Sequence, residues 1–205
     1  MKKYFIALST VALVNVTPYA LASSTDLTIT GLITPAACMP SLSNGGVVDN
    51  GKFPAKDLNP TRGTVVGTET LKLTVACDSP TQFALNPIDN RAGTASLSSW
   101  FGLGLTDAGE KLGWVRVDVK NALADGVAAH AIDSEDGGEN WKQTWVSSPG
   151  YLLSVASLAD FSTPLMVQDL SMDFEVQTNI ARADSLTLTN EVVMDGAVTF
   201  EMKYL

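Results

Sequence analysis

The feature that most constrains the fold of this chain is a two-residue alternation of apolar and polar side chains. It runs through residues 27–33, 71–77, 115–119, 170–178 and 198–204. Successive side chains of a β-strand point to opposite faces of its sheet, so this period is typical of half-buried strands. No window has an equally regular helical period, and the apolar run 152–158 has no period that assigns it. Turn-forming clusters such as Asp78-Ser79-Pro80 separate the segments. The sequence therefore predicts an all-β sandwich.

The first twenty-two residues have the pattern of a secretory signal. Lys2 and Lys3 precede an apolar run that ends at Val14, and Ala20-Leu21-Ala22 offers the small residues that a signal peptidase reads. The apolar run is too short to cross the ~30 Å hydrocarbon layer of a bilayer. We therefore expect a signal peptide over 1–22 and one exported domain over 23–205, with no membrane span, located in the periplasm or at the cell surface.

Composition excludes several functional classes. Loss of the signal would take the formal net charge from −9 to about −11, whereas nucleic-acid binding rests on clustered Lys and Arg. One His and two Cys supply no zinc ligand set. The chain has no Walker lysine motif, no G-x-G-x-x-G and no G-x-S-x-G elbow, and Gly102-Leu103-Gly104 indicates close packing. We expect no nucleic-acid partner, metal, cofactor or catalysis, and a hydrolase built on His130 ranks last.

The only two cysteines, Cys38 and Cys77, both lie in the part that we expect to be exported. Paired cysteines of exported proteins are usually oxidised, so we expect a structural disulfide. The bridge would close a loop of about 40 residues, worth ~4 kcal/mol in the chain-entropy treatment. A redox-active pair is the alternative, but the C-x-x-C spacing of such pairs is missing.

Two stretches leave binding hypotheses open. The acidic residues from Asp133 to Asn140 could offer oxygen ligands to Ca²⁺. They lack the calcium-loop register, however, and a hairpin loop with Gly137-Gly138 at its tip is the simpler interpretation. Four tryptophans fall within 46 residues and more often fill the core of a sandwich. Trp141 and Trp145 flank turn-forming residues, so they are the best candidates for an exposed contact surface, as in a carbohydrate-binding module.

The order of strands and cysteines resembles a known family. An alternating strand containing Gly31 is followed seven residues later by Cys38, a second strand ends at Cys77, and the chain closes on an alternating strand with a penultimate Tyr204. This layout resembles the pilin subunits of the bacterial chaperone–usher pathway. The stretch from Gly93 to Trp114 is more similar to an exported enterobacterial family, domain of unknown function 1120.

This resemblance implies an immunoglobulin-like (pilin-like) sandwich that lacks its last strand and exposes an apolar groove. A periplasmic chaperone, and then a strand from another pilin-like subunit delivered at an usher, would fill that groove by β-strand addition. The complementing strand would contain Leu27, Ile29, Gly31 and Ile33, and the side chains of Leu27, Ile29 and Ile33 would fill the groove. Those of Val198, Phe200, Met202 and Tyr204 would line the groove and face the chaperone.

The chain departs from the pilin pattern in two ways. Only 15 residues separate the expected cleavage site from Cys38, so residues 27–33 could instead be the first strand of this domain. Pilins also carry a glycine fourteenth from the C-terminus, where this chain has Val192 and the nearest glycine is Gly196. Both departures suit a self-contained pilin-like domain or a specialised subunit.

Overall fold

The computed structural model describes residues 37–205, and this part of the chain is all-β. Eleven strands and three short 3-10 turns make up its regular structure. None of these turns has the length and apolar character needed to cross a bilayer. The strands are β1 (Cys38–Leu42), β2 (Thr64–Asp89), β3 (Phe101–Gly102), β4 (Gly113–Ala124), β5 (Val127–Ala128), β6 (His130–Ser134), β7 (Lys142–Gln143), β8 (Val146–Ser147), β9 (Leu152–Ala156), β10 (Met166–Ile180) and β11 (Val198–Tyr204).

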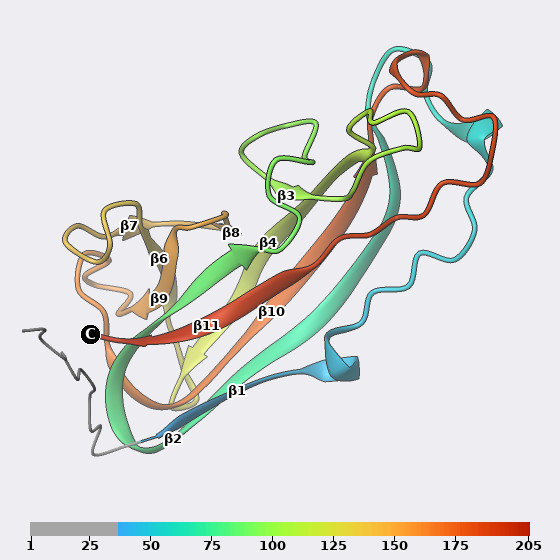
Figure 1. Ribbon diagram of the computed structural model, residues 1–205. Helices are drawn as coiled ribbons and strands as arrows, with labels where there is room; N and C mark the ends of the chain where they lie inside the picture. The colour runs from blue at the N-terminus through green and yellow to red at the C-terminus, as the bar shows by residue number, and fades with distance from the viewer. Residues whose placement is uncertain (1–36) are drawn as a thin grey trace, which may run out of the picture. The chain divides into compact units, whose positions relative to one another are not determined.

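The long strand β2 takes part in two antiparallel sheets (Figure 1). Its first part pairs with β1 on one side and with β10 on the other, and β10 pairs in turn with β4. Its last part pairs with β11 and, at Leu85, with β9, which continues to β6 and β7. The sandwich-like core lies between these sheets and contains Leu73, Met172 and Phe174, all nearly without solvent exposure.

The predicted strands agree with the structure wherever the structure describes them. Residues 71–77 lie in β2, 115–119 in β4, 170–178 in β10, and 198–204 coincide with β11. Residues 27–33 and the signal segment lie outside the described residues. The unassigned run from 152 is β9, whose five residues are all buried. A strand that is buried on both faces has apolar or small side chains at successive positions, so the sequence of β9 shows no two-residue alternation.

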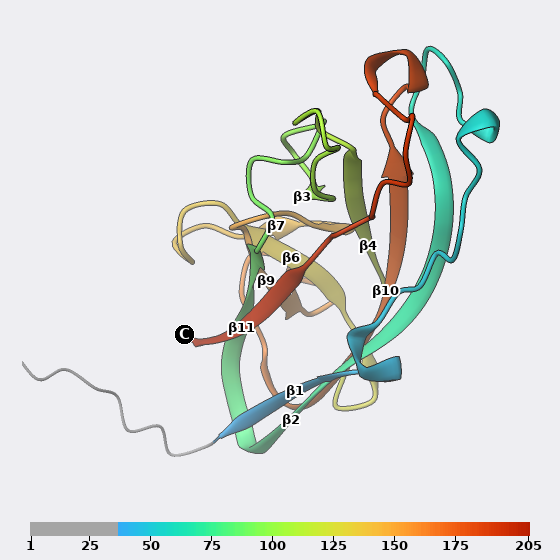
Figure 2. The same ribbon diagram turned by 45° about the vertical axis from the view of Figure 1, so that its right-hand side comes forward.

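One predicted break is wrong. Asp78-Ser79-Pro80 was expected to separate two strands, but β2 runs through it. The turn residues act on the pairing instead, because the register with β10 shifts between Val167 and Asp169, opposite Thr81 and Ala76. The chain thus bends from one sheet into the other without leaving extended structure. Figure 2 shows this bend at the lower end of β2, beside β1.

The glycine stretch 102–104 packs closely, as predicted. A Cβ atom on Gly102 would lie 2.2 Å from the backbone oxygen of Arg91, so no larger residue fits there. Its N–H donates to Asp89, at 2.9 Å. The stretch therefore anchors the loops at the end of the sandwich where β11 begins.

Candidate functional site: the groove between β1 and β11

One long edge of β11 has no partner among residues 37–205. Leu205 N–H donates to Gln82 oxygen at 3.2 Å, and Asn90 N–H donates to Ala197 oxygen at 3.0 Å. Odd-numbered residues of β11 therefore direct their backbone groups toward β2, and even-numbered residues direct theirs away from it. The described part of the chain supplies no hydrogen-bond partner to these outward backbone groups, which belong to Val198, Phe200, Met202 and Tyr204.

The same even-numbered residues turn their side chains toward the core but remain only half-buried. The Phe200 ring lies against Phe174 of β10, with ring centroids 5.0 Å apart. In front of these rings a cavity of about 350 Å³ separates β11 from the end of β1. Apolar side chains dominate its lining, including Leu42, Leu71, Leu103, Val115, Val117 and Val176. The sandwich thus has an apolar interior that opens along the unpaired edge.

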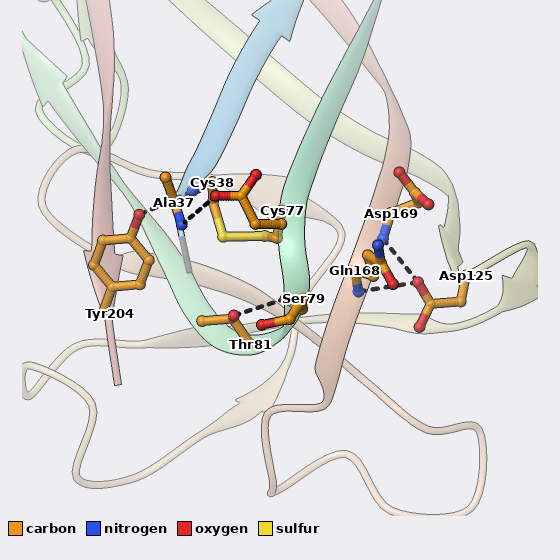
Figure 3. The surroundings of a disulfide bond; sticks show 10 residues. Ala37, Cys38, Cys77, Ser79, Thr81, Asp125, Gln168, Asp169 and Tyr204 are labelled. Carbon is orange, nitrogen blue, oxygen red and sulfur yellow. Dashed lines mark hydrogen bonds between the residues drawn. A yellow bond between two sulfur atoms is a disulfide. The ribbon is translucent and has the colours of Figure 1, made fainter. Parts of the chain in front are cut away.

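β1 forms the other wall, and the disulfide fixes it. Cys38 and Cys77 are bonded directly across the β1–β2 ladder, as predicted, with their Cα atoms 3.9 Å apart. Such close approach marks a pair that exchanges no backbone hydrogen bonds, so the Cys38 N–H points out of the sheet edge. It donates to the Tyr204 phenolic oxygen at 3.0 Å (Figure 3). β1 and β11 are therefore joined at this end of the groove.

The groove continues beyond the start of β11 into a second cavity of about 520 Å³. Its walls are residues 51–55 with Leu58 on one side and residues 188–194 on the other, and its floor includes Leu112 and Ile180. Met194 lines both cavities. An exposed ion pair between Lys52 and Glu191, at 3.4 Å, connects the two walls.

The C-terminal strap, which we define as residues 186–197, carries the second wall into β11. Glu110 accepts hydrogen bonds from the N–H and hydroxyl of Thr187, at 2.6 and 2.8 Å, and these bonds lower the pKa of its carboxyl group. At the other end the Arg91 guanidinium donates two hydrogen bonds of 2.8 Å to the Asp195 carboxylate, and these bonds lower the pKa of that carboxyl group. Polar side chains thus hold both ends of the strap, and near its C-terminal end the Asp195 N–H also donates to the backbone oxygen of Leu103, at 3.1 Å.

Two carboxylates of the acidic loop bond to donors of the protein itself. Asp136 accepts hydrogen bonds from the Ser134 hydroxyl, from the N–H groups of Glu139 and Asn140, and from the Asn140 amide. These donors lower the pKa of Asp136. Glu135 pairs with Lys142. Residues 37–205 contain no group of three acidic, His or Cys side chains that could hold a metal. The loop also contacts β11, because the Lys203 ammonium group donates a hydrogen bond to the backbone oxygen of Gly137, at 2.9 Å.

The other candidate residues lie apart from the groove lining. Trp145 is 66% exposed, whereas Trp141 is half-buried and donates its ring N–H to Gly138 oxygen at 3.0 Å. His130 contacts the Gln143 amide, at 2.9 Å, and the edge of the Phe161 ring. These contacts give the His130 ring neither a hydroxyl nucleophile nor a carboxylate partner, so they offer the hydrolase hypothesis no support.

Sequence reasoning missed the strap and the second cavity. The signal was present, because apolar residues continue at even positions upstream of β11, at Leu186, Leu188, Val192 and Met194. Asn190 and Gly196 interrupt that series, and the strap forms no strand ladder in the described structure. The sequence therefore predicted a strand that begins only at residue 198.

Comparison with known proteins finds a family model and curated relatives to which the chain is similar. The family described as "Protein of unknown function (DUF1120)" matches residues 27–102, which include β1, β2 and β3. Protein GltF of Escherichia coli (strain K12) is 26% identical, covering 90% of this chain and 89% of its own length. The uncharacterized protein YhcF of the same strain is 25% identical, covering 89% and 90%. The expected similarity to domain of unknown function 1120 is therefore found, but over residues 27–102, which overlap the predicted stretch from Gly93 to Trp114 only at 93–102.

Proposed function

We propose that this chain is an exported, non-catalytic fimbrial-like protein that acts through protein–protein contacts, made by β-strand addition at β11. It works in the periplasm or in a surface pilus, with a role in adhesion. Its partners are a periplasmic pilus chaperone, an usher and other pilin-like subunits. The observation that carries this proposal is that the outward edge of β11 has no partner among residues 37–205 and lies in front of an apolar cavity.

The chemistry of the groove suits an extended peptide better than a small molecule. Four outward N–H groups and four outward carbonyls of β11 stand in line, at the spacing of a strand ladder. Side chains that alternate along an added strand would enter the cavity while their neighbours face water. Main-chain hydrogen bonds would then give affinity, and the fit of alternate side chains would give specificity.

Residues 27–33 have the alternation of apolar and other side chains that an added strand would need at this groove. They present Leu27, Ile29 and Ile33 on one face, with Gly31 between them, over seven residues. β11 is also seven residues long. A strand of that length spans ~23 Å and would satisfy the whole free edge.

The test is binding of a synthetic peptide of residues 23–36 to the purified chain, read by fluorescence anisotropy and by amide hydrogen exchange. We expect saturating peptide to protect the outward amides of Val198, Phe200, Met202 and Tyr204, and to raise the free energy of unfolding by ~2.7 kcal/mol at a hundredfold excess over Kd. A peptide with Ile29→Asp is the matched control, because it carries a charge into the cavity.

Co-expression with a periplasmic chaperone of the pilus class gives an independent readout, with Met202→Asp as the groove variant and Thr199→Asp as the outward-facing control, since an Asp side chain can still accept the hydrogen bond from the Asn90 amide. We expect only the groove variant to lose chaperone capture. A stable monomer that captures no chaperone and leaves its β11 amides unprotected at every peptide concentration would contradict the proposal.

A further inference from the structure

We propose that the face of β7 that carries Trp145 binds neutral oligosaccharides. This indole face is formed by Trp141, Gln143 and Trp145, in and beside β7, and by His130 of the neighbouring strand β6. The inference goes beyond the proposed function, because none of these four residues lines either cavity of the groove.

The strand register brings the residues of the indole face together. In the ladder between β6 and β7, which lie side by side in Figure 1, Ile132 faces Gln143. The residue after Gln143 donates its N–H to Ala131 oxygen at 3.0 Å, which continues the same register by one step. Opposed residues of an antiparallel pair share a face, with Cβ atoms ~5 Å apart. Trp145 therefore lies beside His130, on the face that also carries Gln143.

Aromatic rings on this face are open to solvent. Trp145 is 66% exposed, and Phe161, whose ring meets the His130 ring edge-on with centroids 6.3 Å apart, is 51% exposed. Trp141 is half-buried and is held by the hydrogen bond from its ring N–H to Gly138 oxygen. A pyranose ring presents C–H groups on one side, and their weak positive polarisation complements the negative face of an aromatic ring. The Trp145 indole thus offers a surface on which a sugar ring can stack.

The polar groups beside the indole form a matched donor and acceptor. The Gln143 amide nitrogen lies 2.9 Å from His130 Nδ1. An amide nitrogen can only donate, so Nδ1 accepts and the neutral imidazole keeps its proton on Nε2. Within residues 37–205, no hydrogen bond engages either the Nε2–H of His130 or the amide oxygen of Gln143. A sugar hydroxyl donates and accepts at once, so it can use both groups.

Charge and length narrow the class of ligand. None of the four side chains carries a carboxylate, an ammonium or a guanidinium group, so the indole face offers no partner to a charged sugar. Trp141 and Trp145 are four residues apart, which corresponds to ~13 Å along an extended strand. That distance exceeds the width of one sugar ring. A neutral oligosaccharide can therefore contact both indoles, whereas a monosaccharide reaches only one.

The experiment titrates the purified chain with three neutral β-linked probes, cellotetraose, chitotetraose and lacto-N-neotetraose, by calorimetry and by NMR of the side-chain N–H groups. We expect at least one probe to bind and to shift the signals of the Trp145 indole and the Gln143 amide in the wild type. Trp145→Ala should lower the affinity about tenfold or more, because the stacking surface is lost. Gln143→Leu should lower it by about tenfold, because it keeps the volume but removes the polar pair.

Two further variants serve as controls. Trp145→Phe keeps an aromatic face, so it should retain most of the affinity that Trp145→Ala loses. Leu105→Ala removes an apolar side chain that is 47% exposed between β3 and β4, and it should bind as the wild type does.

The inference is overturned if the folded wild type binds none of the three probes at millimolar concentration. It is also overturned if a probe binds without shifting the Trp145 and Gln143 signals, or with equal affinity in Trp145→Ala and Gln143→Leu, because the site would then lie elsewhere. A shift of the Trp145 signal by phosphatidylcholine vesicles and by no sugar would point to a lipid surface and would overturn it too. The wild-type spectra decide the question even if a variant fails to fold, and peptide protection of β11 does not enter any of these results.

Discussion

Removal of the disulfide should cost the domain a large part of its stability. β1 offers little burial of its own, since only Cys38 is buried and three of its five residues are exposed. The cross-link, with a sequence separation of 39, therefore dominates what holds β1 to β2. The chain-entropy relation gives ~4 kcal/mol at 25 °C for a loop of this size. Domains have stabilities of about 5–15 kcal/mol, so the loss would be a quarter or more of the total.

The variant for this test is Cys38→Ala with Cys77→Ala, which leaves no free thiol. Urea unfolding followed by tryptophan fluorescence would give the free energy of unfolding for the variant and for the oxidised wild type. The wild type in the presence of reductant is the matched control, and we expect it to lose the same amount. Because β1 also forms one wall of the groove, the affinity for the 23–36 peptide should fall in both.

A loss below about 1 kcal/mol in a folded variant would refute this reasoning. It would mean that the β1–β2 ladder and the Tyr204 hydrogen bond hold β1 without the cross-link. In that case the disulfide would not be what keeps the groove wall in place.

Three further predictions concern single side chains. Glu110→Gln should lower the melting temperature at pH 7, because the hydrogen bonds from Thr187 lower the pKa of the Glu110 carboxyl and stabilise the fold while that carboxyl is ionised. The difference in melting temperature between the two proteins should be complete above pH 4.5 and should disappear as the pH falls through the lowered pKa of Glu110. Asp133→Asn should raise the melting temperature at pH 7 but not near pH 3, because burial raises the pKa of Asp133 and its ionised form opposes folding. Gly113→Ala should cost roughly 3 kcal/mol in urea unfolding, because its Cβ would lie 1.9 Å from Asn179 oxygen.

Local patterning predicted the strands that have one face in water. β4, β10 and β11 each place alternate residues on the core, so their period of two was visible in the chain. β9 was not assignable, since all five of its residues are buried. The bend in β2 was also out of reach, because Pro80 interrupts pairing and not the extended backbone.

The site was predictable only in part, for a similar reason. The inward residues of β11 follow from its own alternation, and the disulfide follows from the number of cysteines. The link between Tyr204 and Cys38 depends on residues 166 positions apart, and no local pattern contains it. The second cavity was unpredictable for the same reason, because its two walls, residues 51–55 with Leu58 and residues 188–194, lie far apart in the sequence.

The outward edges of β1 and β11 differ in how far they are protected, and this difference connects the fold to the proposed function. Unpaired strand edges invite uncontrolled association, and natural proteins commonly protect them with proline, charge or cover. β1 carries such protection at Pro40, and Tyr204 occupies a further donor. β11 lies across the same groove with inward apolar residues at every second position, and residues 37–205 supply no partner to its outward backbone groups. If the groove were only a packing defect, protection of both edges would stabilise the monomer. Protection of β1 alone favours a groove that is kept available to an incoming strand on the β11 side.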